Sequence, residues 1–233
     1  PDNGLQPGMG NTLAVYGMNQ MDDPKHARIW VGGLAQDPKP PFDFLLSFHI
    51  EGLTNEYDEK SINLVNGKRV ALDAFDDREL LTFPEPVGEV EAFLTTGGTS
   101  TAPWTFDGKL ETYIEKTVRY KGHCETFKAF RDLGLFGRVP VVVNGVEVVP
   151  RDFYHAMLDP KINYPEDKDL IVLRVAVEGI DSGKPKKVVM EMIDFQDEVT
   201  GFRAMERTTG FPPAIVAYLM ASGQIKPGAT PLE

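Results

Sequence analysis

Hydrophobic and polar residues alternate along several stretches of the chain, and this alternation predicts β-strands. The clearest pair is Leu170 to Val177 and Lys187 to Phe195, joined by a turn through residues 180–183, which predicts a long antiparallel hairpin. Two Asn-Gly pairs predict shorter hairpins. Those hairpins lie within Ser61 to Phe83 and Val139 to Val149, and single strands are expected over Ala27 to Leu34, Val90 to Leu94 and Tyr113 to Tyr120.

Helical spacing of apolar residues follows Gly122, where Phe127, Phe130 and Leu133 predict a helix that ends near Gly134. Phe42 to Tyr57 is ambiguous and is interpreted as a strand followed by a short helix. Other helices are expected at Leu13 to Met18, Arg151 to Leu158, Val199 to Thr209 and Pro213 to Ser222. Hairpins without regular βαβ alternation predict an α+β fold with a mixed, largely antiparallel sheet and flanking helices.

The formal net charge of −11 argues against a nucleic-acid or anionic-membrane surface, because no basic stripe is present to neutralise phosphates. The single Cys124 fits a reducing compartment, so we expect a cytoplasmic protein. No apolar run approaches a membrane span, and the first residues do not resemble a signal peptide. The chain starts at Pro1 and stops soon after a helix, which suggests an excised piece.

No dinucleotide-binding or metal-binding motif is present. Gly8-Met9-Gly10 would need a third glycine at position 13, where Leu13 stands, and no strand precedes it. The opening loop is therefore interpreted as structural. No spacing typical of a zinc site occurs among the scattered histidines. Cys124 follows His123 directly, and neighbours in sequence point apart, so we expect Cys124 to be a buried packing residue.

Three segments are candidates for ligand binding. The first holds Arg119, Tyr120, Gly122 and His123 where a strand gives way to a helix, whose N-terminus would help Arg119 and His123 to bind a carboxylate. Equally, Arg119 could pair with a structural carboxylate while His123 merely begins the helix. The second is the hydroxyl-rich loop Gly97 to Thr101 with Thr99 and Ser100. The third is Glu51 to Tyr57 with Glu51 and Asn55, although a solvated helix face explains it as well.

Taken together, ordered blocks along nearly the whole chain resemble the saccharopine dehydrogenase family and its lysine 6-dehydrogenase and carboxynorspermidine dehydrogenase relatives. The blocks are Gly4-Leu5-Gln6-Pro7-Gly8, Val31-Gly32-Gly33-Leu34, Glu51-Gly52-Leu53 with Asn55-Glu56-Tyr57, Gly97-Gly98 with Ser100-Thr101, Val118 to His123, and Ala204-Met205 with Arg207 to Pro212. Lys121 and Ala35 stand where the family usually has proline.

The resemblance implies a two-domain dehydrogenase in which a nucleotide-binding domain precedes this segment and binds most of the NAD or NADP. It implies that Arg119 holds the carboxylate of an amino-acid substrate, with the Ser100 loop nearby. It also implies that the opening residues Leu5, Pro7 and Gly8 face the nicotinamide. Residues 1–26 would be a connector loop and helix, residues 27–197 the substrate-binding and dimerisation domain, and residues 198–233 a C-terminal helical segment.

The leading hypothesis is the substrate-binding and dimerisation domain of an NAD(P)-dependent oxidoreductase acting on lysine or a lysine-derived amino acid. His123 is its candidate for proton transfer, because an imidazole exchanges protons near neutral pH. The chain alone is expected to be inactive. The alternative is a non-catalytic dimerisation or ligand-sensing module, because the hairpin from Leu170 to Phe195 offers a sheet on which two subunits could meet. Either hypothesis predicts a homodimer.

Overall fold

The computed structural model describes residues 2–226 and 228–233, so Pro1 and the start of the expected connector lie outside the described residues. Its helices are α1 (Met9–Met18), α2 (Ile50–Asp58), α3 (Ala102–Thr105), α4 (His123–Asp132), α5 (Pro150–Ile162) and α6 (Ala204–Ala221). Its strands are β1 (Asp23–Ala35), β2 (Lys60–Val65), β3 (Lys68–Asp73), β4 (Glu79–Phe83), β5 (Gly88–Phe93), β6 (Thr112–Arg119), β7 (Val141–Val143), β8 (Val146–Val148), β9 (Asp169–Asp181) and β10 (Lys184–Phe195).

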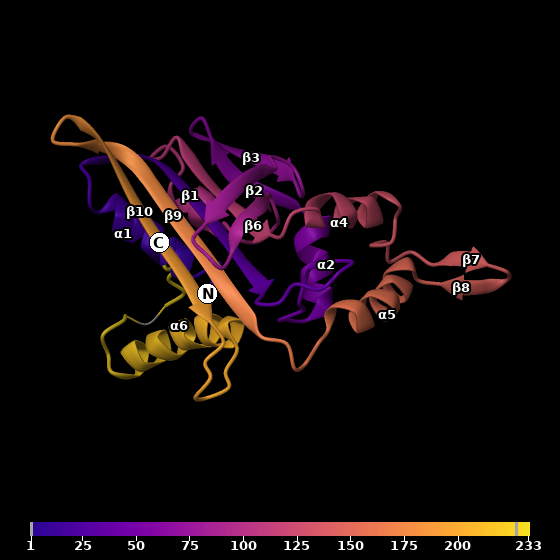
Figure 1. Cartoon of the computed structure of the whole chain (residues 1–233). Helices are drawn as coiled ribbons and strands as arrows, with labels where there is room; N and C mark the ends of the chain where they lie inside the picture. Colours follow the sequence, from indigo (N-terminus) through magenta and orange to yellow (C-terminus); the bar gives the residue numbers. More distant parts are fainter. Residues whose placement is uncertain (1, 227) are drawn as a thin grey trace.

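Eight strands form one twisted sheet in the order β10-β9-β1-β6-β2-β3, with β5 also pairing with β6 and β4 with β5. Among the described strands only β1 and β6 run parallel to each other. The predicted α+β fold with a mixed, largely antiparallel sheet is therefore confirmed. The long β9–β10 hairpin forms one side of the molecule, while the β7–β8 hairpin projects from the opposite side (Figure 1).

Two hairpins share one edge of β6. Leu64 and Val65 of β2 pair with the start of β6, whereas residues 91–93 of β5 pair with residues 117–119 at its end. Residues 114–116 pair with neither hairpin, although β1 pairs with them on the other side. The middle of β6 is thus open on one edge, and Glu115 lies at this opening.

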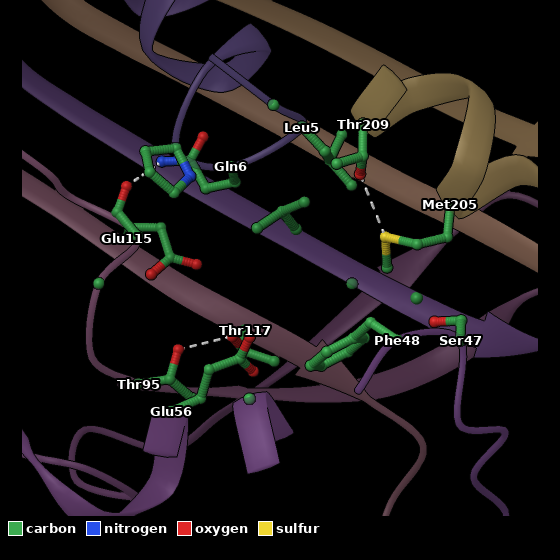
Figure 2. A pocket seen from close by; sticks show the side chains of 18 of the residues that line it. Leu5, Gln6, Ser47, Phe48, Glu56, Thr95, Glu115, Thr117, Met205 and Thr209 are labelled. Carbon is green, nitrogen blue, oxygen red and sulfur yellow. Dashed lines mark hydrogen bonds between the residues drawn. The ribbon is translucent and has the colours of Figure 1, made fainter. Parts of the chain in front are cut away.

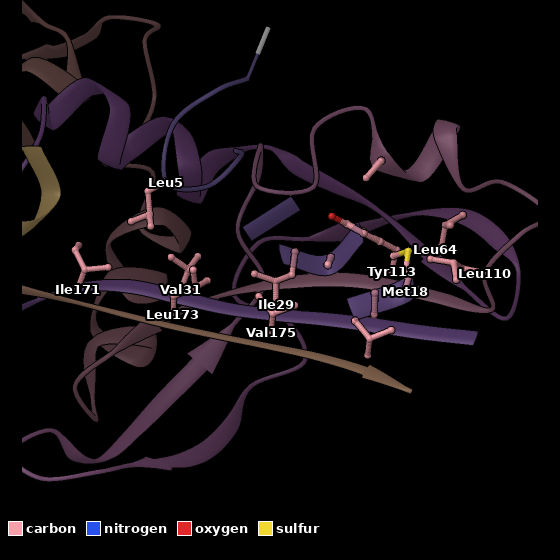
Figure 3. Close-up of a cluster of buried hydrophobic side chains, with 14 of the residues drawn as sticks. Leu5, Met18, Ile29, Val31, Leu64, Leu110, Tyr113, Ile171, Leu173 and Val175 are labelled. Carbon is pink, nitrogen blue, oxygen red and sulfur yellow. The ribbon is translucent and has the colours of Figure 1, made fainter. Parts of the chain in front are cut away.

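Helix α1 packs on one face of the sheet and forms the main core. Ile29 and Val31 of β1 meet Ala14 and Met18 of α1 together with Leu173, Val175 and Val177 of β9 (Figure 3). The contact is close at Gly17, where a Cβ would lie 2.7 Å from the Val177 side chain. Burial of apolar side chains such as these contributes about 25 cal/mol per Å². This core fixes β1 and β6 beside the N-terminal end of α1.

Residues 42–48 form a buried loop, so the strand expected there is wrong. Phe44 and Leu46 are buried with α2, α4 and α5 in a second hydrophobic cluster. The backbone is held by a bond from Leu46 N to the carbonyl oxygen of Ile162 at 2.8 Å, and Asp43 has a φ of 47°, which a strand does not allow. An apolar run without alternation therefore marks burial here and not β-structure. The short helix expected after it is confirmed as α2.

A single helix, α6, replaces the two helices expected between Val199 and Ser222. Its start is set by the buried carboxylate of Asp169, which accepts bonds from Ala204 N at 2.7 Å and Met205 N at 2.8 Å. Pro212 and Pro213 lie inside the helix. Proline fixes φ at a helical value, so the pair removes two backbone donors without ending the helix. Asp169 thereby ties α6 to the start of β9 (Figure 1).

Candidate functional site

A cavity of about 920 Å³ opens on the α1 side of the sheet, beyond the N-terminal end of α1. Its walls come from the opening loop, the segment from Ser47 through α2, the loop after β5, the strands β1 and β6, and the start of α6 (Figure 2). The lining includes Leu5, Gln6, Pro7, Val31, Gly32, Gly33, Ser47, Phe48, Asn55, Glu56, Thr95, Gly97, Gly98, Glu115, Thr117, Arg119, Met205 and Thr209. A volume of this size suits a small organic ligand.

Strand β6 supplies the polar floor of the cavity. Because side chains alternate along a strand, Glu115, Thr117 and Arg119 all point to the same face. Thr117 Oγ1 lies 2.7 Å from Thr95 Oγ1, which joins the floor to the loop after β5. The parallel neighbour β1 contributes Val31 to the same cavity, and Met205 and Phe48 add apolar surface. The result is a polar strip with apolar sides.

Arg119 is a buried cation at one end of this strip, with 3% of its surface exposed. Its Nε donates to Tyr57 Oη at 3.1 Å, its Nη1 to the carbonyl oxygen of Val118 at 3.0 Å, and its Nη2 lies 3.8 Å from Glu56 Oε2. The guanidinium also stacks over Phe44. A guanidinium carries five N–H donors, so donors remain for a ligand in the cavity.

Two of the carboxyl groups that line the cavity with Arg119 have raised pKa values. Burial raises the pKa of Glu115 to about 8, and the nearby Glu56 adds to this rise while Arg119 opposes it. Burial likewise raises the pKa of Glu56 to about 7, again against the attraction of Arg119. Both groups can therefore exchange protons near neutral pH, which makes this cavity a candidate for acid–base chemistry as well as binding.

His123 does not line the cavity. Its ring is buried and stacks on Phe127 at a centroid distance of 3.9 Å, and its Nε2 lies 2.9 Å from Tyr57 Oη. Burial and Arg119 lower the pKa of the imidazole well below its ordinary value, so the ring is neutral. The placement suits a residue that orients Tyr57, and through it Arg119. Direct proton transfer to a ligand would require this ring to move.

The expected joint anion site of Arg119, His123 and the helix N-terminus is not formed, because the protein's own Glu91 occupies that N-terminus. Cys124 N donates to Glu91 Oε1 at 2.7 Å, and Glu91 Oε2 accepts from Arg78. Gly122 caps α4 with a φ of 95° and does not line the cavity. Tyr120 points to the other face and donates to the carbonyl oxygen of Ala35.

The loop after β5 lines the cavity through Thr95, Thr96, Gly97 and Gly98, and not through the hydroxyl groups of Thr99 and Ser100. Thr99 Oγ1 donates to the carbonyl oxygen of Ile62, and Ser100 Oγ donates to Asp2. Gly98 is held by Gln6, whose side chain donates to its carbonyl oxygen. The expected ligand-binding hydroxyls are thus engaged within the protein.

Glu51 and Asn55 belong to an ion-pair network on α2. Arg151 Nη1 donates to Asn55 Oδ1 at 2.7 Å, and Arg138 Nη2 donates to Glu51 Oε1 at 2.5 Å. Only Asn55 of these two predicted binding residues lines the cavity. Arg151 is buried and also donates to Asp58 Oδ2 at 2.6 Å, so the network fastens α2 to α5. Neither Glu51 nor Asn55 forms a hydrogen bond or ion pair with Arg119 in the structure.

Leu5 and Pro7 line the cavity, whereas Gly8 does not. The glycines of this loop serve internal packing. A Cβ on Gly8 would lie 2.1 Å from the Gly4 carbonyl oxygen, and one on Gly10 would lie 2.1 Å from Gln6 Oε1. The space that a dinucleotide loop would leave for a pyrophosphate is therefore filled by the protein itself. The opening loop therefore does not fit a pyrophosphate in the manner of a dinucleotide-binding glycine loop.

Sequence reasoning missed Glu115, Thr117, Glu56 and Gln6 as cavity residues. A signal for two of these four was available, because Glu115 and Thr117 alternate with Arg119 and so place polar groups on one face of a predicted strand. Glu56 lies within the predicted segment Glu51 to Tyr57 and Gln6 within a block of the family resemblance, but the sequence singles out neither. Across residues 2–226 and 228–233 no cluster of three or more metal-ligating side chains occurs, and no helix has the length and apolarity to cross a membrane.

Comparison with known proteins places these observations in a family. The family model described as "Saccharopine dehydrogenase C-terminal domain" matches residues 4–233. A solved structure of apo, histidine-tagged saccharopine dehydrogenase (L-Glu forming) from Saccharomyces cerevisiae is similar in fold, with a TM-score of 0.75 and 19% sequence identity. The match covers 97% of this chain and 66% of that one, so the chain spans slightly less than two thirds of the yeast protein.

Proposed function

The chain belongs to the saccharopine dehydrogenase C-terminal domain family, and on this premise we propose that its cavity binds the amino-acid substrate of an NAD(P)-dependent oxidoreductase. The proposed substrate is lysine or a lysine-derived amino acid, as in the lysine 6-dehydrogenase branch, and the proposed setting is the cytoplasm. The domain would supply one wall of a substrate cleft. The other wall and the redox group would come from a nucleotide-binding domain, so this chain alone would be inactive.

The proposal rests on the burial of the Arg119 guanidinium at the cavity wall. A buried guanidinium with donors left over for the cavity is a site for a carboxylate, because planar N–H donors match carboxylate oxygens in pairs. Tyr57 and His123 hold the guanidinium in place behind the cavity wall. This chain would therefore bind and orient the substrate through its carboxylate, which lowers the entropic cost of bringing the reacting carbon to the redox group.

NAD or NADP would supply the hydride chemistry when bound by the other domain. The glycine loop is filled by the protein itself, so the contact that the opening loop makes with the cofactor would come from Leu5 and Pro7 at the cavity wall. The third residue expected to face the nicotinamide, Gly8, lies behind them against Gly4. No step of the chemistry is therefore assigned to the opening loop itself.

A substrate panel tests the proposal. We expect the full-length protein, supplied with NAD or NADP, to produce reduced nicotinamide absorbance with L-lysine, saccharopine or a diamine, because the cavity offers both a carboxylate site and carboxyl groups for amines. Ligands with a carboxylate should be preferred over diamines, since only they can use Arg119. A protein that turns over none of these with either cofactor would instead be the non-catalytic ligand-sensing module, and the oxidoreductase proposal would be wrong.

We also propose that the protein is a homodimer that meets through β10. This strand has a hydrogen-bonded neighbour on one side only among the described residues, and Val189 on it has 51% of its surface exposed. An edge strand with apolar exposure is a natural pairing surface for a second copy.

Light scattering of the full-length protein should give twice the mass of one chain. Val189→Lys should shift the protein toward monomer, whereas Val142→Lys on the projecting hairpin should not; a monomeric parent protein would refute the proposal.

A further inference from the structure

Glu115 is the most unusual group in the cavity. Only 1% of its surface is exposed, yet its Oε2 has no hydrogen-bond partner in the structure. An unpaired carboxyl group away from water costs the fold several kcal/mol if it is ionised, so such groups persist mainly where they serve a ligand. Its carboxyl group points into the cavity between Gln6 and Thr117 (Figure 2). Among the described residues, no donor forms a hydrogen bond with Glu115 Oε2.

Gly98 makes the room for this carboxyl group. A Cβ at position 98 would lie 2.1 Å from Glu115 Oε2 and 2.4 Å from its carboxyl carbon. Any side chain on Gly98 would therefore occupy the place of the carboxylate. The loop is in turn anchored by the Gln6 side chain on the Gly98 carbonyl oxygen. The glycine pair after β5, together with the opening loop, thus shapes a pocket for one carboxyl group.

The charges that line the cavity favour a ligand with positive charge. Arg119 is the only cationic side chain among the described lining residues, whereas the acidic ones are Asp2, Glu56, Glu59, Glu115 and Glu206. Arg119 and Glu115 are four residues apart on β6, so their Cα atoms are separated by about 13 Å along the strand. The strip therefore offers a carboxylate site at one end and an amine site at the other. Glu56 lies beside Arg119, where an α-ammonium group would sit.

We infer that Glu115 binds the distal ammonium group of the substrate, at the end of the cavity formed by the opening loop. The inference rests on the proposed function, because it takes this cavity to be the substrate site. A lysine-like ligand has the required form: a carboxylate and an α-ammonium group at one end and a second ammonium at the end of a four-carbon stem. The ammonium would satisfy the unpaired Glu115 Oε2 through a charge-assisted hydrogen bond.

Proton release gives this inference a signature that a structural role lacks. Burial and the nearby Glu56 raise the pKa of Glu115 to about 8, whereas Arg119 opposes this rise. Burial also raises the pKa of Tyr113, the neighbouring residue on the same face of β6, so its hydroxyl group stays neutral. In the empty cavity at pH 7 the carboxyl group therefore keeps its proton. An ammonium group favours the ionised form, so its binding lowers the pKa of Glu115 and releases a proton. Lysine affinity should accordingly rise as the pH is raised from 6 to 8.

Calorimetry on the full-length protein with the reduced form of its nicotinamide cofactor, which cannot oxidise the ligand during the titration, tests the inference. L-Lysine is compared with L-norleucine, which lacks the distal ammonium, in buffers of different ionisation enthalpy. Glu115→Gln should weaken lysine binding about 10- to 100-fold, leave norleucine binding unchanged, and remove the proton released at pH 7. Gly98→Ala should weaken lysine binding in the same way, because it displaces the carboxyl group. Glu111→Gln, at the exposed start of the same strand region, is the matched control and should change nothing.

The outcomes separate this inference from the proposed function. If Glu115→Gln binds lysine as tightly as the parent protein, or loses lysine and norleucine equally, the assignment of Glu115 is wrong while the substrate site can stand. If the parent protein binds neither ligand and turns over no member of the substrate panel, the proposed function fails and the assignment falls with it. Thermal unfolding of each variant shows whether it is folded. Glutamine and glutamate have nearly the same shape, so we expect Glu115→Gln to fold.

Discussion

Replacing Arg119 by alanine is expected to lower kcat/KM of the full-length protein for its best amino-acid substrate roughly 100- to 1,000-fold, which corresponds to about 3–4 kcal/mol. The variant loses the donors that would bind the substrate carboxylate, and it leaves Glu56 and Tyr57 without their buried partner. Because the carboxylate is remote from the reacting carbon, most of the loss should appear in KM. Steady-state kinetics by nicotinamide absorbance measure both parameters.

Two further variants make the Arg119 prediction specific. Arg119→Lys keeps the charge but not the planar pair of donors, so its kcat/KM should fall between those of the parent protein and the alanine variant. Arg28→Ala removes a partly exposed arginine of β1 that pairs with Glu178 outside the cavity, and it should leave the kinetics unchanged. An Arg119→Ala protein with parent-like kcat/KM would show that the carboxylate is bound elsewhere.

Glu115→Gln is expected to stabilise the protein, and the gain should grow with pH. The folded pKa of Glu115 is about 8, whereas its reference value is 4.5. Between these values the folded state keeps a proton that the unfolded state has lost, so the free energy of unfolding falls as the pH rises. Glutamine removes this dependence. The variant should match the parent near pH 4.5 and exceed it by roughly 2–4 kcal/mol near pH 8.5.

Urea unfolding followed by tryptophan fluorescence measures this difference, since Trp30 and Trp104 both belong to the domain. Glu91→Gln is the matched control. Glu91 is also buried in the sheet, but its carboxylate accepts bonds from Arg78 Nε and Cys124 N at 2.7 Å each. Its replacement should therefore destabilise the protein. A gain for Glu115→Gln that is equal at all pH values would contradict the raised pKa and point to better packing alone.

Local sequence signals placed the two Asn-Gly hairpins correctly, because their turns are decided by adjacent residues. Asn66 and Asn144 adopt φ values of 52° and 51°, and the following glycines also have positive φ, as two-residue hairpin turns require. The same signals failed where distant groups decide the backbone. The buried loop at residues 42–48 depends on Ile162 and on the aromatic cluster around α4, and the start of α6 depends on Asp169, which lies 35 residues earlier.

Residue patterns along the chain predicted the α+β class, the mixed sheet and the buried thiol of Cys124, and they made Arg119 a candidate that the structure places at the cavity, because alternation, turn residues and strand-to-helix boundaries are local properties. Only the tertiary structure decided what shares a cavity with Arg119. Glu115 lies in the gap that two hairpins leave on the edge of β6, and Gly98 makes room for it from another segment. Burial in that arrangement sets the pKa of Glu115, and no pattern along the chain contains that information.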